Sequence, residues 1–357
     1  MQTISVYLVL TFTRQTIFFP KRPYPKSPNP APNPSVSVLD IVSSISSQTD
    51  VLTEGTPQNL AYNWLLTDDT LDPSNDQQTI INRYVLAVLY YATDGPNWEF
   101  CPDDVDPSTC PGPNNQFLSD SNVCEWAGVF CTRGQVTAVR LLDVGLGEGP
   151  VPSEMGSLLS LNELALEDGD LVGVPTELYP LTGLISLSFR ANNIIGEIPP
   201  QTALLTELNE LLLESNNLSG ELPDFLNKLE KLEALTLGDN RFTGGIPESY
   251  DSLRDLRSLT VAANFLTGTL PSVLGKLTQL KSLAVFENFM SGTVPTDLGK
   301  LTDLEQLLLH FNDFTGTMPA EICALRASGQ LEILTANCAG ANPQVICDFP
   351  ACCTLCF

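Results

Sequence analysis

Two kinds of residue in this chain suit catalysis, metal binding or cross-linking: one histidine and ten cysteines. If the segments around them are neighbouring strands, His310 has Glu287 beside it, but no serine or cysteine. A catalytic histidine requires a nucleophile or a paired acid within hydrogen-bond reach. We therefore predict that the chain is not an enzyme and has no catalytic residue, no metal and no cofactor.

The cysteines gather at the two ends of the central sequence, at Cys101, Cys110, Cys124, Cys131, Cys323, Cys338, Cys347, Cys352, Cys353 and Cys356. Their even number favours disulfides, which form in an oxidising compartment. Zinc is the alternative, but paired C-x2-C motifs are lacking. Cys101 is expected to pair with Cys110 within a proline- and glycine-rich insertion. The last six cysteines allow fifteen pairings, and the sequence does not select one.

One glycine-rich run superficially resembles a nucleotide-binding loop, but the sequence around it does not support that function. The run Gly145-Leu146-Gly147-Glu148-Gly149 lacks the G-x-G-x-x-G spacing, a following helix and a P-loop lysine. It is better interpreted as an irregular turn. The kinase motifs are also missing, so a receptor that contained this chain would carry its signalling part elsewhere.

A 24-residue repeat must position the remaining candidates. Six consecutive segments follow the template L-x-x-L-x-L-x-x-N-x-L-x-G-x-I-P with conservative exchanges, and they begin at Leu184, Leu208, Leu232, Leu256, Leu280 and Leu304. Their asparagines are Asn192, Asn216, Asn240, Asn264, Asn288 and Asn312. Such a regular period indicates a solenoid, because each coil can bury its leucines only against its neighbours.

Each column of the repeat has a structural interpretation. Apolar side chains that alternate along L-x-x-L-x-L predict a strand, and stacked strands form a parallel sheet. The asparagine ends the strand by satisfying backbone groups in a turn. The glycine permits a backbone angle that a Cβ would resist, and the proline then fixes an extended segment.

These runs, such as Leu218-Ser219-Gly220-Glu221-Leu222-Pro223, resemble those of plant-type leucine-rich-repeat proteins over roughly residues 77 to 337. The resemblance implies an α/β fold, a right-handed horseshoe with a parallel concave sheet that binds ligands. The C-x-W-x-G-V-x-C string from Cys124 to Cys131 is similar to the family's N-terminal cap, in which the two cysteines pair. The ending Cys-Cys-x-x-Cys resembles the C-terminal caps of repeat proteins from diatom-like algae.

The predicted domains are an apolar and proline-rich, largely disordered segment (1–56), a helical cap with disulfides (57–135), the repeats (136–327), and a last strand with a cysteine-rich cap (328–357). Helices are expected over 59–67 and 75–92, and a short one over 324–330. The first strand is expected over 136–144 and the last over 331–334, and 35–54 is expected to stay loose. The apolar run over 4–12 is shorter than the roughly 18 residues of a membrane span. The run could be a signal peptide or a membrane tether, but no basic residue precedes it and no clear small-residue cleavage site follows, so a truncated gene model is the alternative.

A net charge of −25 and a pI near 4.1 exclude nucleic acid as a partner, because phosphates would be repelled. A basic partner fits this charge, although solubility alone also explains it.

Side chains that alternate with the core leucines point out of the concave face, where a solenoid selects its partners. An acidic group comprises Glu163, Glu167, Asp168, Glu210 and Glu214, with Arg190 between them. A second group comprises Phe286, Glu287, Leu308, His310 and Phe311. Grouped exposed aromatics favour a contact site. The alternative is that the C-terminal cap folds over Phe311.

Two further patterns lie outside the sheet. Hydroxyl rows comprise Thr267, Thr269, Ser291, Thr293, Thr315 and Thr317, and they suit ice binding or simply follow the repeat consensus. Asn217 begins a glycosylation sequon, which agrees with secretion.

We predict a non-catalytic recognition module, secreted or at the cell surface, that binds a protein, peptide or glycan on its concave face. It could be the ectodomain-like part of a receptor that uses a co-receptor. The alternatives are an inhibitor of secreted wall-degrading hydrolases and a structural or ice-binding surface protein. The sequence predicts neither the ligand nor the oligomeric state.

Overall fold

One long sheet positions the candidate ligand-contacting side chains. Its strand order is β1-β2-β4-β6-β8-β10-β12-β13-β15-β18-β20, and only the β1–β2 pair is antiparallel. The bounds are β1 Val129–Thr132, β2 Gln135–Leu142, β4 Glu163–Glu167, β6 Ser186–Ser188, β8 Glu210–Leu212, β10 Ala234–Thr236, β12 Ser258–Thr260, β13 Ser282–Ala284, β15 Gln306–Leu308, β18 Ile333–Ala336 and β20 Leu355–Cys356. The computed structural model describes residues 37–67, 76–99, 117–173, 176–338, 344–347 and 352–357.

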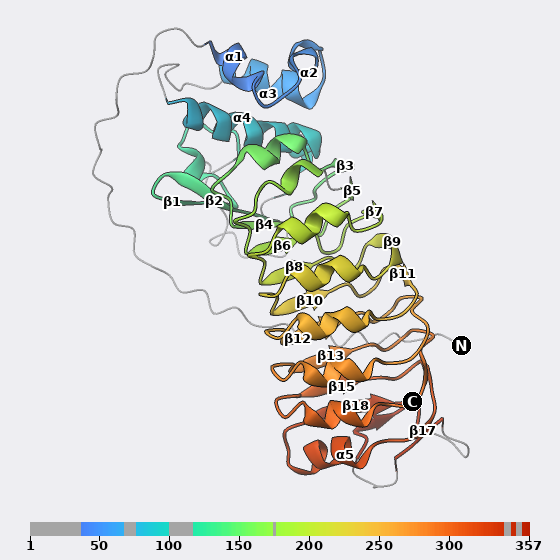
Figure 1. The fold of residues 1–357 in the computed structure, drawn as a ribbon. Coiled ribbons are helices and arrows are strands. Elements are labelled where there is room, and N and C mark those ends of the chain that lie inside the picture. The colour runs from blue at the N-terminus through green and yellow to red at the C-terminus, as the bar shows by residue number, and fades with distance from the viewer. Residues whose placement is uncertain (1–36, 68–75, 100–116, 174–175, 339–343, 348–351) are drawn as a thin grey trace. The chain divides into compact units, whose positions relative to one another are not determined.

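From β6 to β15, residues paired on neighbouring strands are 24 positions apart, which is the period of the sequence repeat. Leu235 lies opposite Leu211 on one side and Leu259 on the other, so equivalent leucines stack in file. All three are essentially inaccessible to solvent, and the coils follow one another in chain order from β4 to β18 (Figure 1). This arrangement confirms the predicted right-handed solenoid with its parallel sheet. The outward side of this sheet is the concave face.

Short 3-10 turns and small strands complete the coils on the other sides. The turns are η4 Ser153–Ser157, η5 Thr176–Leu178, η6 Pro200–Leu204, η7 Asp224–Lys228, η8 Glu248–Ser252, η9 Ser272–Lys276 and η10 Thr296–Lys300. The strands are β3 Gly149–Pro150, β5 Leu171–Gly173, β7 Ile195–Gly196, β9 Asn217–Glu221, β11 Arg241–Thr243, β14 Ser291–Gly292, β16 Asp313–Phe314, β17 Gly316–Thr317 and β19 Val345–Ile346. Gly268 shows why the repeat requires glycine, since its φ of 76° disfavours a side chain.

Buried asparagines tie each coil to the one before it. Asn240 Nδ2 donates to the carbonyl oxygen of Leu213 in the preceding coil at 2.9 Å. Its Oδ1 accepts from the backbone N–H of Leu218 at 2.9 Å. The same interactions recur in this asparagine ladder at Asn192, Asn216, Asn264, Asn288 and Asn312. The asparagine therefore ends the strand, as predicted, and also joins neighbouring coils.

The residue before each ladder asparagine has a left-handed backbone. Its φ lies between 50° and 56° at Ala191, Ser215, Asp239, Ala263, Glu287 and Phe311. This conformation is uncommon for residues with a Cβ, and here each strand leaves the sheet through it. The side chains of this column and of the residues just after the asparagines form the rim of the concave face.

Four helices cover the first coil: α1 Val38–Val42, α2 Gln48–Leu52, α3 Pro57–Thr67 and α4 Gln77–Ala92. They are followed by the 3-10 turns η1 Gly95–Asn97 and η3 Val123–Glu125. The last two helices confirm the expected helices over 59–67 and 75–92, and a Cys124–Cys131 disulfide is present. The 1–36 segment, Cys101 and Cys110 lie outside the described residues, and the pairing expected for these two cysteines stays a prediction.

The expectation that residues 35–54 stay loose is wrong for 37–54, the part of this segment that the structure describes. Ser37 caps α1 through a capping box with Asp40, and Val42 and Val51 are fully buried. Between the two helices, Ser46 Oγ donates to Glu154 Oε1 at 2.7 Å and accepts from Tyr84 Oη at 2.9 Å. Because buried polar groups need partners, this network fixes the segment on the first coil.

The C-terminal cap begins with α5 Ala320–Ala327, which starts before the short helix expected over 324–330. The strand expected over 331–334 is β18, but it is not the last of the sheet, because β20 pairs beyond it. Three disulfides join the predicted cysteines as Cys323–Cys352, Cys338–Cys356 and Cys347–Cys353. None of the described helices combines the length and apolar character that a bilayer crossing requires.

Candidate functional site

The middle of the concave face has a floor of small side chains. The outward positions of β10 and β12 hold Ala234 and Thr236, then Ser258 and Thr260. The next strand, β13, continues this floor with Ser282 and Ala284. Larger residues follow on either side, Glu210 and Leu212 on β8 and Gln306 and Leu308 on β15. The sheet therefore offers a low central strip between two chemically different ends.

Ion pairs hold the N-terminal end of the concave face. Arg190 Nε lies 2.7 Å from Glu214 Oε1 and its Nη1 lies 3.9 Å from Glu167 Oε2, so the cation bridges two coils. Ser186 Oγ donates to Glu210 Oε2 at 2.8 Å. The structure thus brings the predicted acidic group together, and much of its negative charge is balanced by ion pairs and hydrogen bonds within the protein.

Glu163 and Asp168 are the other two acids of this group. Arg140 Nε donates to Glu163 Oε1 at 2.6 Å, and this bond raises the pKa of the guanidinium. Partial burial raises the pKa of the Asp168 carboxyl, and the charge of Arg190 opposes that rise.

Aromatic rings gather at the C-terminal end of the concave face. The His310 imidazole stacks on Phe286 with centroids 4.8 Å apart and on Phe357 at 4.3 Å. Phe311 meets His310 edge-on at 5.0 Å. These four rings form the aromatic cluster. The structure thus unites three predicted residues with Phe357, which the sequence analysis missed.

The His310 ring is held neutral. Its Nδ1 lies 2.7 Å from Thr335 Oγ1, and burial lowers the pKa of the imidazole to about 4. Rings that stack on both faces remove the water that would solvate a positive charge. An imidazole enclosed in this way is suited to packing against a ligand.

The remaining residues of the predicted aromatic group lie partly on the sheet and partly on the rim. Leu308 lies half-buried on β15, opposite Ala284 and Thr335. Glu287 and Phe311 belong to the left-handed column, and 48% of Phe311 remains exposed although Phe357 contacts it at 5.2 Å. The tail therefore covers Phe311 only in part, which lies between the two arrangements considered from the sequence.

Two exposed rings were overlooked in the sequence. Phe265 and Phe289 follow ladder asparagines in successive coils, and their rings stack with centroids 6.3 Å apart. They lie on the rim rather than on the strand, so the period-two pattern does not reveal them. The recurring Asn-Phe pair at Asn264 and Asn288 is the signal that could have identified them.

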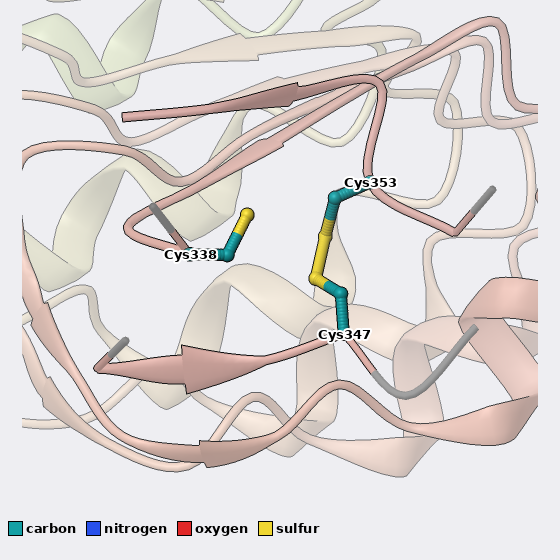
Figure 2. A group of neighbouring side chains, drawn as sticks. All are labelled: Cys338, Cys347 and Cys353. Atoms are coloured by element: carbon teal, nitrogen blue, oxygen red, sulfur yellow. A yellow bond between two sulfur atoms is a disulfide. The ribbon is translucent and has the colours of Figure 1, made fainter. Parts of the chain in front are cut away.

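Three cysteines of the C-terminal cap have the proximity of a metal site. The sulfurs of Cys338, Cys347 and Cys353 lie within 4.8 Å of one another, and Figure 2 shows two of them joined by a disulfide. Cys338 is bonded to Cys356, so all three sulfurs are oxidised. A metal ligand must be a thiolate, and this group therefore serves as a covalent cross-link.

The remaining predicted positions lie on the flank of the coils. Asn217 is partly exposed in β9, where a glycan could be attached. The hydroxyls of Thr267 and Ser291 each lie 3.4 Å from a glycine carbonyl of the preceding coil. The first hydroxyl row consists of Thr267, Ser291 and Thr315, and this contact gives its first two members a role between coils.

The chain is similar to plant receptor proteins over its repeats. It is 38% identical over 84 residues to "Leucine-rich repeat receptor-like serine/threonine-protein kinase RGI4" of Arabidopsis thaliana, which is 23% of this chain and 8% of that protein. The chain thus spans less than a tenth of this curated relative. No protein-family model matches it.

Two solved structures resemble the solenoid. The ectodomain of the Arabidopsis receptor kinase HAESA, described in complex with an IDA peptide hormone, is 30% identical with a TM-score of 0.59, covering 70% of this chain and 40% of that one. The ectodomain of GASSHO1/SCHENGEN3 from Arabidopsis thaliana, described in complex with CASPARIAN STRIP INTEGRITY FACTOR 2, is 28% identical with a TM-score of 0.59, covering 73% and 32%.

The repeat template, the asparagine ladder and these similarities agree. The chain belongs to the plant-type leucine-rich-repeat proteins.

Proposed function

We propose that this chain is a non-catalytic recognition module that binds an extended peptide, free or within a larger protein, on its concave face. The observation that carries this proposal is the chemical gradient along the sheet, from ion-paired acids through a strip of small residues to the aromatic cluster. A peptide with a basic end and an apolar end would fit this order. The similar HAESA ectodomain is described with a peptide hormone, which supports this ligand class.

The scaffold favours such binding energetically. The ladder asparagines and the stacked leucines fix the strands before a ligand arrives, so little conformational entropy is lost on contact. Four disulfides in the described residues support an extracellular or cell-surface setting. A co-receptor is a second partner compatible with this class.

Site-specific photo-crosslinking tests the proposal. A benzoylphenylalanine at Thr260 reports on the concave face, and one at the exposed Ser272 of η9 is the matched control. When the full chain is exposed to a secreted peptide fraction, we expect the Thr260 sample to give one adduct whose added mass is that of a peptide. The Ser272 sample should give none. Equal labelling at the two positions would contradict the proposal.

Once a peptide is identified, the aromatic cluster can be tested. Phe286→Ala and Phe311→Ala should each weaken binding by about 1 kcal/mol or more, which is at least fivefold in Kd. Leu204→Ala removes a residue with 55% exposure from η6 and should leave Kd unchanged. Calorimetric titration measures all three.

The alternatives give different outcomes. An inhibitor of a wall-degrading hydrolase would yield a crosslinked product with the mass of a folded enzyme. Ice binding would require the hydroxyl rows, yet the first row already contacts carbonyls of the preceding coil. An ice-recrystallisation assay with Thr269, Thr293 and Thr317 replaced by valine tests that function directly.

A further inference from the structure

A hollow of about 500 Å³ opens on the rim, outside the concave face. The residues that shape it are Asp239, Ala263, Phe265, Glu287, Phe289 and Phe311. Phe265, Phe289 and Phe311 are 50%, 56% and 48% exposed, so three large apolar side chains face solvent within two coil spacings. A cluster of this kind on a protein surface indicates a contact site.

The charged residues that line the hollow are both acidic. Asp239 and Glu287 are exposed, and no lysine or arginine lines it. They occupy the left-handed column two coils apart, with Ala263 between them. Strands lie about 4.8 Å apart, so a group above Ala263 would be about 5 Å from the backbone of each acidic residue's coil. Both flexible side chains could reach that group.

The aromatic rings add a second attraction for a cation. Phe265 and Phe289 lie nearly parallel, with 12° between their planes, and form one wall of the hollow. A guanidinium is attracted to the face of an aromatic ring and stacks on it readily. Its aliphatic stem packs on apolar surface while its charged head reaches carboxylates.

We propose that this rim hollow is a binding subsite for an arginine side chain of a partner peptide. The arginine sits above Ala263, between Asp239 and Glu287, and stacks on the pair Phe265 and Phe289. An apolar residue beside it in the peptide packs on Phe311. The inference goes beyond the concave-face function, because Asp239, Phe265, Glu287 and Phe289 lie on the rim and take no part in it; only Phe311 belongs to both sites.

Phe311 connects the hollow to the aromatic cluster, since it contacts both His310 and the hollow. A single peptide could therefore run from the sheet over the rim. A second copy of this chain is a poorer occupant, because the net charge of −25 makes two copies repel each other. An anionic lipid surface is repelled for the same reason.

The experiment uses the full chain with 4-fluorophenylalanine at Phe289, and a second sample labelled at Phe286 on the concave face. The probe is the peptide acetyl-Gly-Phe-Arg-Gly-amide, and its matched control carries citrulline, which keeps the shape of arginine without its charge. Titrations followed by 19F NMR give the affinity at each position. We expect a saturable shift at Phe289 with the arginine peptide and binding roughly fivefold or more weaker with citrulline.

Charge-neutral variants test the carboxylates. Asp239→Asn with Glu287→Gln should remove the preference for arginine over citrulline. Asp255→Asn with Asp303→Asn removes the same charge from exposed turns elsewhere and should keep that preference. Since all four residues are exposed, thermal melts should show that both double variants remain folded.

Three outcomes would overturn the subsite: no shift at Phe289 up to about 10 mM peptide, equal binding of the citrulline peptide, or an unchanged preference in the Asp239 and Glu287 variant. A shift confined to the Phe286 sample would also overturn it, while leaving the concave-face function intact. Crosslinking from Thr260 is a separate readout, so the two proposals can fail independently.

Discussion

The His310 imidazole lies against the Phe357 ring, with centroids 4.3 Å apart and planes 18° from parallel. Phe286 occupies the other face of the imidazole at an angle of 4°. A histidine between two apolar rings loses solvation for its charged form, and this explains why the pKa of His310 falls to about 4. A residue of the C-terminal cap thus helps to keep His310 on the concave face uncharged.

Removing the covering ring should reverse this effect. In Phe357→Ala, we expect the pKa of His310 to rise from about 4 towards its usual 6.5, because water reaches the imidazole. The chain has one histidine, so its Cε1–H resonance in a pH titration is unambiguous. Leu355→Ala, which shortens an exposed side chain of the same cap, is the control. An unchanged pKa in Phe357→Ala would show that Phe357 does not desolvate the ring.

The same pKa predicts how stability depends on pH. The folded pKa of about 4 lies below the unfolded value of 6.5, so the unfolded chain binds the proton first. The stabilisation is complete above pH 6.5 and is lost as the pH falls from 6.5 towards 4. After discounting for partial exposure, the loss is roughly 2 kcal/mol.

Comparison with His310→Gln isolates this contribution from the carboxylates, which titrate in both proteins. Urea unfolding at pH 7 and at pH 4.5 should show a smaller decrease in the free energy of unfolding for the variant. Identical decreases in the two proteins would contradict a depressed histidine pKa.

A rung of the asparagine ladder should be costly to remove. In Asn240→Ala, the N–H of Leu218 loses its bond to the amide oxygen, and the carbonyl of Leu213 loses the shorter of its two side-chain bonds and keeps only that from Asn216 Nδ2 at 3.2 Å. We expect a loss of roughly 3 kcal/mol in the free energy of unfolding, because both groups stay buried. Asn193→Ala is the matched control, since this exposed residue bonds Asp170, and it should cost less than about 0.5 kcal/mol. Similar losses in the two variants would argue against the ladder.

The cysteine pairing can be tested by mass spectrometry. Non-reducing peptide maps should contain linked peptides for Cys323–Cys352, Cys338–Cys356 and Cys347–Cys353. A double replacement of Cys323 and Cys352 by serine opens the longest of these loops and should cost about 2–4 kcal/mol. Detection of Cys347 linked to Cys338 would contradict the arrangement, since these sulfurs are neighbours but not partners.

The fold of the repeats could be predicted because every coil has the same sequence pattern. Leu211, Leu235 and Leu259 occupy equivalent columns, so one coil determines how the next one packs. The helices before the repeats depend on distant contacts instead. Ser46 bonds Glu154 across 108 positions, and no local pattern near Ser46 predicts that partner.

The candidate site was only partly predictable for a related reason. Alternation along a strand identified Phe286 and His310, which the structure does bring together. It could not place Phe357, because the tail reaches His310 through a cap fixed by disulfides that its cysteine spacing does not specify. Phe265 and Phe289 escaped because the left-handed residue before each asparagine turns the chain away from the strand pattern.

The hydrogen bonds of the ladder have one more consequence. Asn216 and Asn264 make the same contacts with the coils that precede them. A genetic duplication or excision of one complete 24-residue period would present each side of the junction with an unchanged bonding surface. The molecule could therefore change its reach in whole-coil steps, whereas a shift by any other number of residues would leave a rung without its counterpart.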